Sequence, residues 1–456
     1  MIPARARWRR RTGRAAALAA IVAALAACAS AASALVARPA RATAPVTRPA
    51  RATAPVTRPA RAAAPVTRPA RAAAAIPSAV RASESLGLAL LNRLGHGAGN
   101  VVFSPYSIET ALSMVGEGAR GSTARQIDHV LLTRSPAAVA AGLAALNRRL
   151  TAASTAPNAP RVDVANGLWV QSGLVLRQPF TEALATLFRA PPQLTDFAGA
   201  PETARQAINA WVAARTENRI GNLFPPGTIT HQTAAVLANA IYLAAHWAHP
   251  FTPSRTAPGP FYPGAGAPVH VPFMTDGAGA PVHVPFMTEA PTEFAYARRA
   301  GYRAIDLPYL SSTLSMLLVM PAPGTLASFE RALTGRGLAR VERSLSPRRV
   351  DLRVPRFELK FDTALNAVLS HLGMPIAFTN GANFSGITAP TQLKIAAVEH
   401  AADLKVDEQG TVAAAATGIG LVPTSIMVGP TTRLTLDHPF LAFLRDDATG
   451  AILFVA

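Results

Sequence analysis

The stretch between Glu408 and Arg433 constrains the fold of this chain more than any other segment, because its 24 residues include no charged side chain. No proline occurs in it before Pro423. A segment that becomes the middle strand of a sheet must make every ladder hydrogen bond, which proline prevents, and must bury no unpaired charge. Long structureless stretches are uncommon in compact domains, and loops are normally polar. The segment is therefore either able to enter a sheet as a central strand or a flexible loop of an alanine-rich protein.

The positive charge of the chain is concentrated in its N-terminal region. The formal net charge is +19, but residues 1–83 alone hold fifteen arginines and no acidic residue. The remaining 373 residues carry only +4, and they contain no basic stripe with interleaved aromatic residues. This distribution disfavours a nucleic-acid-binding role. Half of the 456 residues are apolar, which suffices for a large buried core.

Residues 1–27 have the features of an export signal. Six arginines precede the apolar run Ala15–Ala27, whose 13 residues are too few to span about 30 Å of hydrocarbon as a helix. The run ends in Leu-Ala-Ala before Cys28, a pattern that resembles the bacterial lipoprotein box, in which the cysteine is lipidated and the chain is cut before it. Cys28 is the only cysteine, so one chain forms no disulfide. We expect a signal peptide of the lipoprotein type and an extracellular protein lipid-anchored to the membrane through Cys28; free secretion is the alternative.

Residues 28–78 contain a repeat of ten residues in which Arg-Pro-Ala-Arg recurs from position 38 to position 71. Each unit holds two prolines and a single valine as its large apolar residue, so it cannot bury a core. We expect this region to be a disordered Pro/Ala/Arg tether, although a low-complexity repeat without function is an equal alternative.

Apolar periodicity then indicates a mixture of helices and strands. A helix begins at Ser104, where a hydroxyl cap precedes a proline. Residues 162–171 and 350–361 alternate as strands, and residues 363–372 have helical spacing. The nearly all-apolar run at 233–245 is typical of a central strand covered on both faces.

One internal duplication interrupts this pattern, since residues 264–276 recur almost unchanged as residues 277–289. The copies place His270 and His283 in equivalent positions. A duplicated loop explains both histidines, and no second ligand spacing supports a metal site. We expect one copy to protrude from the surface, and we expect no metal or other cofactor.

Several segments, in order, resemble the serpin family of serine protease inhibitors. They include NVVFSPYSIETALSMVGEGARGST from residue 100, INAWVAARTENRIGNLFP from 208, LANAIYLAAHWAHPF from 237, VDEQGTVAAAAT from 406 and DHPFLAFLRDDATGAILFVA from 437. The resemblance implies an α+β serpin domain over residues 79–456, with three β-sheets, eight or nine helices and an exposed reactive-centre loop. It also implies a monomeric inhibitor rather than an enzyme.

The resemblance assigns roles to individual residues. The polar gate behind the central strands, called the shutter, corresponds to Ser104, Ser107, Asn239 and His400; an isolated, satisfied core histidine is the alternative for His400. Trp247 falls in the breach, where the loop begins to enter the sheet. The loop hinge corresponds to Glu408, Gly410, Thr411, Val412, Ala413, Ala414, Ala415, Ala416 and Thr417, with Val412 in place of a usual glutamate.

The implied mechanism is suicide-substrate inhibition, in which a protease cuts the loop and the freed N-terminal half inserts into the main sheet. Family spacing places the cut bond at Thr424–Ser425, with Met427, Val422 and Leu421 as alternative positions before the cut. The residues before the bond suit an elastase-like or subtilisin-like protease. The chief alternative is a non-inhibitory serpin that acts as a binding or carrier module. A hydrolase is disfavoured because the chain has no Gly-x-Ser-x-Gly, His-Glu-x-x-His or phosphate-loop motif.

Overall fold

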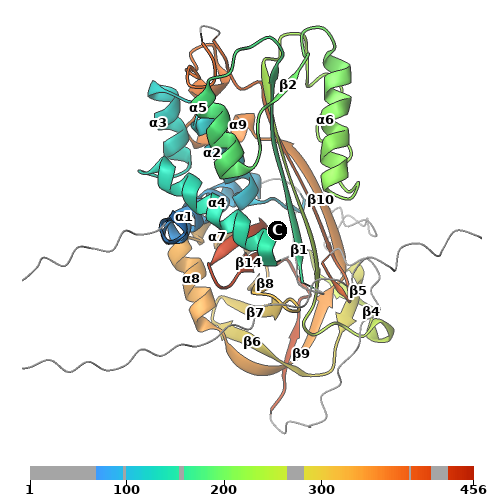
Figure 1. Cartoon of the computed structure of the whole chain (residues 1–456). Helices are drawn as coiled ribbons and strands as arrows, with labels where there is room; N and C mark the ends of the chain where they lie inside the picture. Colours follow the sequence, from blue (N-terminus) through green and yellow to red (C-terminus); the bar gives the residue numbers. More distant parts are fainter. Residues whose placement is uncertain (1–67, 96–98, 154–158, 264–281, 390–391, 412–429) are drawn as a thin grey trace, which may run out of the picture. The chain divides into compact units, whose positions relative to one another are not determined.

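The computed structural model describes residues 68–95, 99–153, 159–263, 282–389, 392–411 and 430–456, and every structural statement below concerns these residues (Figure 1). They include nine α-helices. The helices are α1 (Arg68–Leu94), α2 (Pro105–Gly116), α3 (Gly121–Val130), α4 (Pro136–Ala153), α5 (Gln178–Ala183), α6 (Pro201–Arg215), α7 (Leu326–Ala332), α8 (Gly335–Ser344) and α9 (Asn366–Leu372).

A six-stranded sheet runs through the molecule in the order β10-β11-β12-β3-β1-β2. Its strands are β1 (Arg161–Gln171), β2 (Gln193–Thr195), β3 (Ala235–His246), β10 (Phe357–Ala364), β11 (Ala397–Val406) and the two-residue β12 (Gly410–Thr411). Strands β11 and β3 are parallel, and β12 is antiparallel to both. The centre of this sheet positions the candidate site.

The other strands form a nine-stranded sheet. They are β4 (Ala257–Phe261), β5 (Val282–Thr288), β6 (Thr292–Arg299), β7 (Tyr302–Pro308), β8 (Leu314–Pro321), β9 (Ser346–Pro355), β13 (Thr432–Thr435), β14 (Leu441–Asp446) and β15 (Ala451–Val455). The resemblance implies three sheets, whereas the strands of the structure are hydrogen-bonded into two sheets. The joint is β9, whose first half pairs with β6 and whose second half pairs with β5 and β13.

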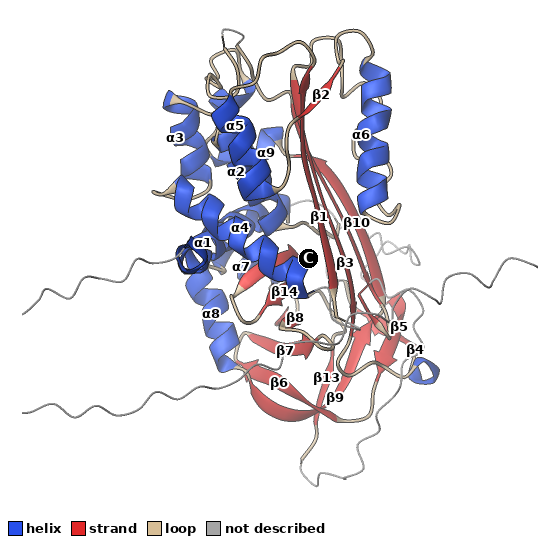
Figure 2. Ribbon diagram, viewed as in Figure 1, coloured by secondary structure: helices blue, strands red, loops and turns tan. Residues whose placement is uncertain are grey.

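The central strand β3 is buried on both faces, as its apolar sequence predicts. Alternate residues such as Leu237 and Ile241 belong to the main core, whereas Val236 and Ala238 belong to a second cluster beneath α6. Figure 2 shows α6 on one face of the six-stranded sheet, with α2, α3 and α5 on the other. Because two layers cover the sheet, any new central strand must bury its side chains on at least one face.

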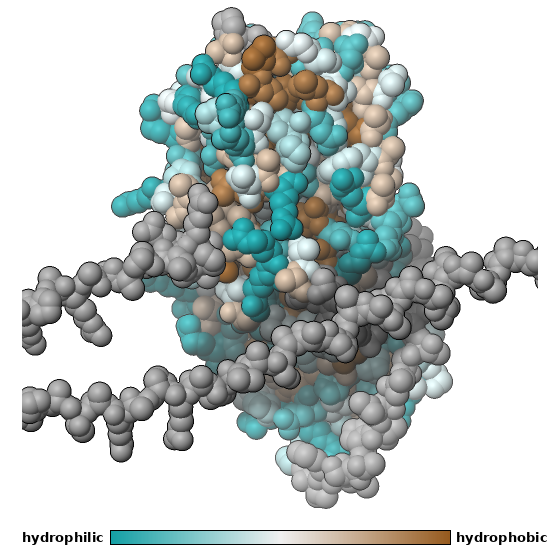
Figure 3. Space-filling model, viewed as in Figure 1, coloured by the Kyte–Doolittle hydropathy of each residue, from teal (hydrophilic) through white to brown (hydrophobic). Residues whose placement is uncertain are grey.

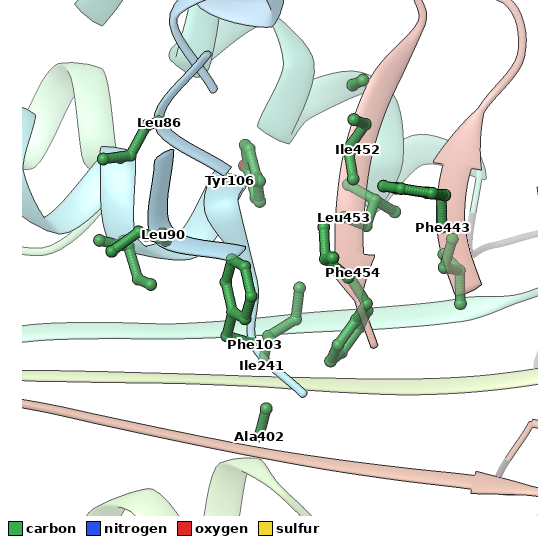
Figure 4. Packing of buried hydrophobic residues seen from close by; sticks show 14 of the residues in the cluster. Leu86, Leu90, Phe103, Tyr106, Ile241, Ala402, Phe443, Ile452, Leu453 and Phe454 are labelled. Carbon is green, nitrogen blue, oxygen red and sulfur yellow. The ribbon is translucent and has the colours of Figure 1, made fainter. Parts of the chain in front are cut away.

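The main core joins the helical layer to both sheets. Leu86 and Leu90 of α1 pack near Phe103 and Tyr106, and the apolar side chains of β15 lie opposite them (Figure 4). Phe103 exchanges backbone hydrogen bonds of 2.9 Å with Val455. These contacts fix the start of α2 beneath the centre of the six-stranded sheet.

Helix α1 begins at Arg68, whereas the sequence places the end of the tether at residue 78. Alanine is the strongest helix former, and the segment 72–75 is all alanine. Pro77 lies inside the helix but is exposed. Residues 68–78, which the sequence analysis assigns to the disordered tether, therefore belong to helix α1 in the structure.

The single strand expected over residues 350–361 is in fact two strands in different sheets. Strand β9 ends at Pro355 and β10 begins at Phe357. Pro355 has no N–H for a central ladder, and the Arg356 N–H donates instead to the Pro285 carbonyl at 2.8 Å. Strand β10 also continues to Ala364, so the helix expected from residue 363 begins only at Asn366.

Helix α8 was not predicted, because two glycines in its first turn lower its helix propensity. Thr334 caps it by accepting a hydrogen bond from the Gly337 N–H at 3.2 Å. The second copy of the duplication supplies β5, while the whole first copy, with His270, lies outside the described residues. The protruding copy therefore stays a prediction.

Apolar atoms gather at the end of the molecule where Figure 1 places α5 and β2 (Figure 3). Val175, before α5, is 78% exposed, and Leu194 of β2 is 57% exposed.

Within the described ranges, no helix is long and apolar enough to cross a membrane. Across the same ranges, no three histidine, cysteine or carboxylate side chains are grouped closely enough to hold a metal ion.

Candidate functional site

The six-stranded sheet is partly open at one end of its central pair of strands. Strands β11 and β3 pair directly from Ala397 opposite Val236 to Ala402 opposite Ile241. Beyond these residues the two strands separate, and β12 lies between them. The opening therefore already accommodates the first two residues of a new central strand.

The residues that enter this opening belong to the predicted hinge. Gly410 lies opposite His246, and Thr411 lies opposite both Ala245 and Val406. Residues 412–417 of the hinge, and the predicted bond Thr424–Ser425, lie outside the described residues. The structure thus brings Gly410 and Thr411, the described part of the hinge, into the sheet.

A tight turn delivers the hinge to this position. The Asp407 carboxylate accepts hydrogen bonds from the N–H groups of Gln409 and Gly410, at 3.0 and 3.3 Å. A Cβ atom at Gly410 would lie only 1.9 Å from the carbonyl oxygen of Ala245. Glycine is therefore required at position 410 by the close approach of the β3 backbone.

An aromatic pair closes the end of the opening. The rings of Trp247 and Tyr309 stack with centroids 4.5 Å apart and an angle of 12° between their planes. The Trp247 indole donates to the Asp407 carbonyl at 3.0 Å, and its backbone N–H donates to Gln409 at 2.9 Å. The Tyr309 hydroxyl lies 2.5 Å from the hydroxyl of the fully buried Thr411. Trp247 thus lies in the predicted breach and contacts the turn before the hinge.

Glu408 fastens the turn to a different part of the molecule. Its carboxylate accepts a hydrogen bond of 2.7 Å from the Thr256 hydroxyl and lies 3.5 Å from the Arg356 guanidinium. Its carbonyl oxygen accepts a hydrogen bond from the Phe251 N–H at 2.8 Å. The side chain is only 9% exposed, so this carboxylate holds the entrance of the sheet rather than facing solvent.

A buried hydrogen-bond network crosses the closed part of the central pair. His400 of β11 lies opposite Asn239 of β3, and its Nδ1 is 2.7 Å from the Asn239 Oδ1. Its Nε2 accepts a hydrogen bond of 3.2 Å from the backbone N–H of Ser104. Since Nε2 accepts, Nδ1 carries the proton and donates to Asn239. Burial lowers the pKa of His400 to about 3, so the ring is neutral at ordinary pH.

The amide of Asn239 links this network to α2 and to the neighbouring strand. Its Nδ2 donates to the Ser107 carbonyl at 2.6 Å and to the Asn166 Oδ1 at 2.5 Å. The Ser104 hydroxyl caps α2 by accepting from the Ser107 N–H at 3.1 Å. The Ser107 hydroxyl itself has no hydrogen-bond partner among the described residues. The four predicted shutter residues are therefore brought together, but Ser107 participates through its backbone.

Three residues of the site were not identified from the sequence. Asn166 joins the shutter from β1, Tyr309 joins the breach from a bridge with Trp247, and Arg356 faces Glu408. Each is far from its partner in the chain, so no local pattern could have identified it. Asn166 had one signal, because it is the one amide or charged residue in the segment 164–170 of β1.

The arrangement can admit a strand. Insertion between β11 and β3 would replace one parallel ladder with two antiparallel ladders, the orientation that β12 already has. Antiparallel pairs are slightly more stable per residue than parallel pairs. The obstacle is the closed segment, where the His400–Asn239 bond must break before the strands can separate.

The comparisons with known proteins agree with this geometry. A family model described as Serpin (serine protease inhibitor) matches residues 81–456. Iripin-2 of Ixodes ricinus is 33% identical over 372 residues, which are 81% of this chain and 90% of the relative. Human thyroxine-binding globulin superposes with a TM-score of 0.71 at 25% identity, covering 84% of this chain and 98% of the globulin. Uncleaved ovalbumin gives a TM-score of 0.70 at 25% identity, covering 83% and 98%.

Proposed function

The chain belongs to the serpin (serine protease inhibitor) family, which is not a family of enzymes, and we propose that this chain inhibits a serine protease as a suicide substrate. The α+β serpin fold expected from the sequence is confirmed by the superposed structures. The observation that carries the proposal is β12, the pair of hinge residues that lies between β11 and β3.

The reaction begins as ordinary proteolysis. The protease serine attacks the carbonyl carbon at the reactive bond, proposed as Thr424–Ser425, and forms a covalent acyl-enzyme. The bond to the Ser425 nitrogen breaks, this nitrogen takes up the proton relayed from the protease serine, and the new N-terminus departs. The freed half of the loop then remains attached to the protease through its carboxyl end.

Insertion of that half traps the protease. Residues 411–424 would span about 46 Å at about 3.3 Å per residue, similar to the 12 residues of β3 at about 40 Å. The bound protease is thereby carried along the sheet, away from the breach, before water can release it. The uninserted form is held by a kinetic barrier, to which the His400–Asn239 bond contributes.

The target class follows from the sequence before the proposed bond. Leu-Val-Pro-Thr at 421–424 has small or apolar residues and no arginine, which suits an elastase-like or subtilisin-like protease. We expect either enzyme to form a complex that survives SDS electrophoresis and to release a peptide that begins at Ser425. Clean cleavage without a complex would refute inhibition and favour the carrier function instead.

A matched pair of variants tests the insertion step. At the two-residue strand period, Ala413 shares the face of the buried Thr411, whereas Ala414 faces the opposite side. Ala413→Arg should bury an unpaired charge on insertion and turn the inhibitor into a substrate. Ala414→Arg adds the same charge on the other face and should retain more complex formation. Equal loss in both variants, or no loss in either, would contradict insertion.

The location of the protein is part of the proposal. We infer a bacterial lipoprotein, exported by residues 1–27 and held on the outer face of the membrane by lipid on Cys28, with the repeats as a tether. The lipoprotein-like pattern before Cys28 supports this. Cys28→Ala should move the protein from the membrane fraction to the soluble fraction, and unchanged partitioning would reject the anchor.

A further inference from the structure

A pocket of about 530 Å³ lies among α7, α8 and the adjoining ends of β6 and β7, away from the opening at β12. Figure 1 shows α8 beside these strands. Three arginines line the pocket: Arg299 at the end of β6, and Arg340 and Arg343 in the second half of α8. All three are exposed at the surface.

The three guanidinium groups are not neutralised by carboxylates. Arg299 donates only to the backbone carbonyls of Arg298 and Ser344, and no ion pair involves any of the three arginines in the described part of the chain. The one carboxylate of α8, Glu342, is bound at 2.7 Å by Arg445 of β14. The pocket is therefore positively charged, and none of the described residues that line it is acidic.

This positive charge is not spread over the whole domain. Residues 298–349 hold nine arginines and three carboxylates, a net charge of +6, whereas the whole of residues 84–456 carries only +4. Arg298 even lies directly opposite Arg303 in the β6–β7 ladder, and like charges in that relation are destabilising. The helix C-terminus can favour Arg343, but this does not account for Arg299 on a separate element.

The floor of the pocket is apolar and partly aromatic. Tyr302 and Phe329 line it with ring centroids 5.9 Å apart, and Leu333 adds an aliphatic surface. The Tyr302 hydroxyl lies 3.2 Å from the Ser344 hydroxyl, which holds the ring across the floor. Pockets of this volume, with an apolar lining and a few converging polar groups, are typical of small-molecule sites.

We propose that this pocket binds an amphiphilic anion, a small aromatic or alkyl body that carries one phosphate, sulfate or carboxylate group. The planar guanidinium groups match the oxygen geometry of such anions. The apolar body would cover Tyr302, Phe329 and Leu333. A long polyanion would contact the arginines but would not cover the apolar residues at the floor of the pocket.

The test is isothermal titration calorimetry of the purified full chain with 1-naphthyl phosphate, inorganic phosphate and 1-naphthol. We expect 1-naphthyl phosphate to bind at least about tenfold more tightly than either of the other two, because only it satisfies both the arginines and the floor. No protease is involved, so the result is independent of the proposed inhibition.

Two double variants with the same change of charge separate the pocket from its surroundings. Arg340→Gln with Arg343→Gln should weaken binding of 1-naphthyl phosphate at least about tenfold. Arg331→Gln with Arg336→Gln changes exposed arginines outside the lining and should leave it nearly unchanged.

Three results would overturn the proposal. If inorganic phosphate binds as tightly as 1-naphthyl phosphate or more tightly, the apolar floor contributes nothing. Equal losses in both double variants would indicate a diffuse basic surface suited to polyanions. Absence of 1-naphthyl phosphate binding up to millimolar concentration would reject the pocket as a site of this chemistry.

Discussion

Acidification should destabilise this protein through one buried imidazole, His400. The ring is fully buried, accepts a hydrogen bond from Ser104 at Nε2 and donates to Asn239 from Nδ1. A proton added at Nε2 would remove that acceptor and place a charge on a ring that no carboxylate of the described residues hydrogen-bonds. The bond to Asn239 joins β11 to β3, so the same proton would also weaken the closed part of the sheet.

The size of the effect follows from the pKa of His400, which burial lowers from 6.5 to about 3. Above pH 6.5 both folded and unfolded chains hold a neutral ring, and the stabilising contribution is complete. Below that pH the unfolded chain takes up the proton first, so stability is lost as the pH falls from 6.5 toward 3. The loss is about 2 kcal/mol at pH 5 and about 4 kcal/mol at pH 3, and it approaches about 5 kcal/mol only below that pH.

The assay is thermal unfolding followed by fluorescence between pH 8 and pH 5. With an unfolding entropy of about 0.8 kcal/mol/K for a domain of this size, 2 kcal/mol corresponds to a fall in Tm of about 2–3 °C. His400→Gln, which cannot titrate, should lack this part of the pH dependence. Warming at pH 5 should also favour uncleaved loop insertion in the wild type, seen as a heat-resistant monomer or as oligomers on native gels.

His371→Gln is the control, because it makes the same substitution at a histidine that is exposed on α9. Its pH dependence should match that of the wild type. If His400→Gln shows the same slope of Tm against pH as the wild type, the ring is not a buried neutral group in solution and the reasoning fails.

Three further substitutions test other parts of the structure. Glu408→Lys should place a positive charge near Arg356 and open the breach, which should give more oligomers on warming. Adding Arg356→Glu to the same chain should restore the monomer, and failure of that rescue would contradict the contact. Thr411→Val should leave the buried Tyr309 hydroxyl without its partner at a cost of about 1–3 kcal/mol, seen as a lower Tm, while Thr411→Ser should retain it. Burial raises the pKa of Glu109, so the stabilising contribution of this group is complete below about pH 4.5 and is lost as the pH rises through the raised pKa. Glu109→Gln should therefore increase Tm at pH 7 but not at pH 4. An equal change of Tm at both pH values would refute this.

Much of the fold was predictable because local patterns carry it. The strand at β1, the capped start of α2 and the two-faced burial of β3 all follow from residue spacing and apolar content. Helix α8 was not predicted because glycine obscures helical periodicity. The break between β9 and β10 was not predicted because the alternation of apolar and polar residues continues across Pro355. The early start of α1 escaped because prolines suggested an extended tether.

The sequence by itself determined that residues 409–432 carry no charge, and that a glycine and a small hydroxyl residue stand where such a segment must bend and enter a sheet. Only the tertiary structure decided where it enters. Tyr309 contacts Thr411 from 102 positions away, and Asn166 contacts Asn239 from 73 positions away. Arg356 faces Glu408 from 52 positions away. Such pairs are selected by packing rather than by local spacing. Burial likewise fixes the neutral state of His400, because the identity of a side chain sets only its reference pKa and the surroundings in the fold shift it.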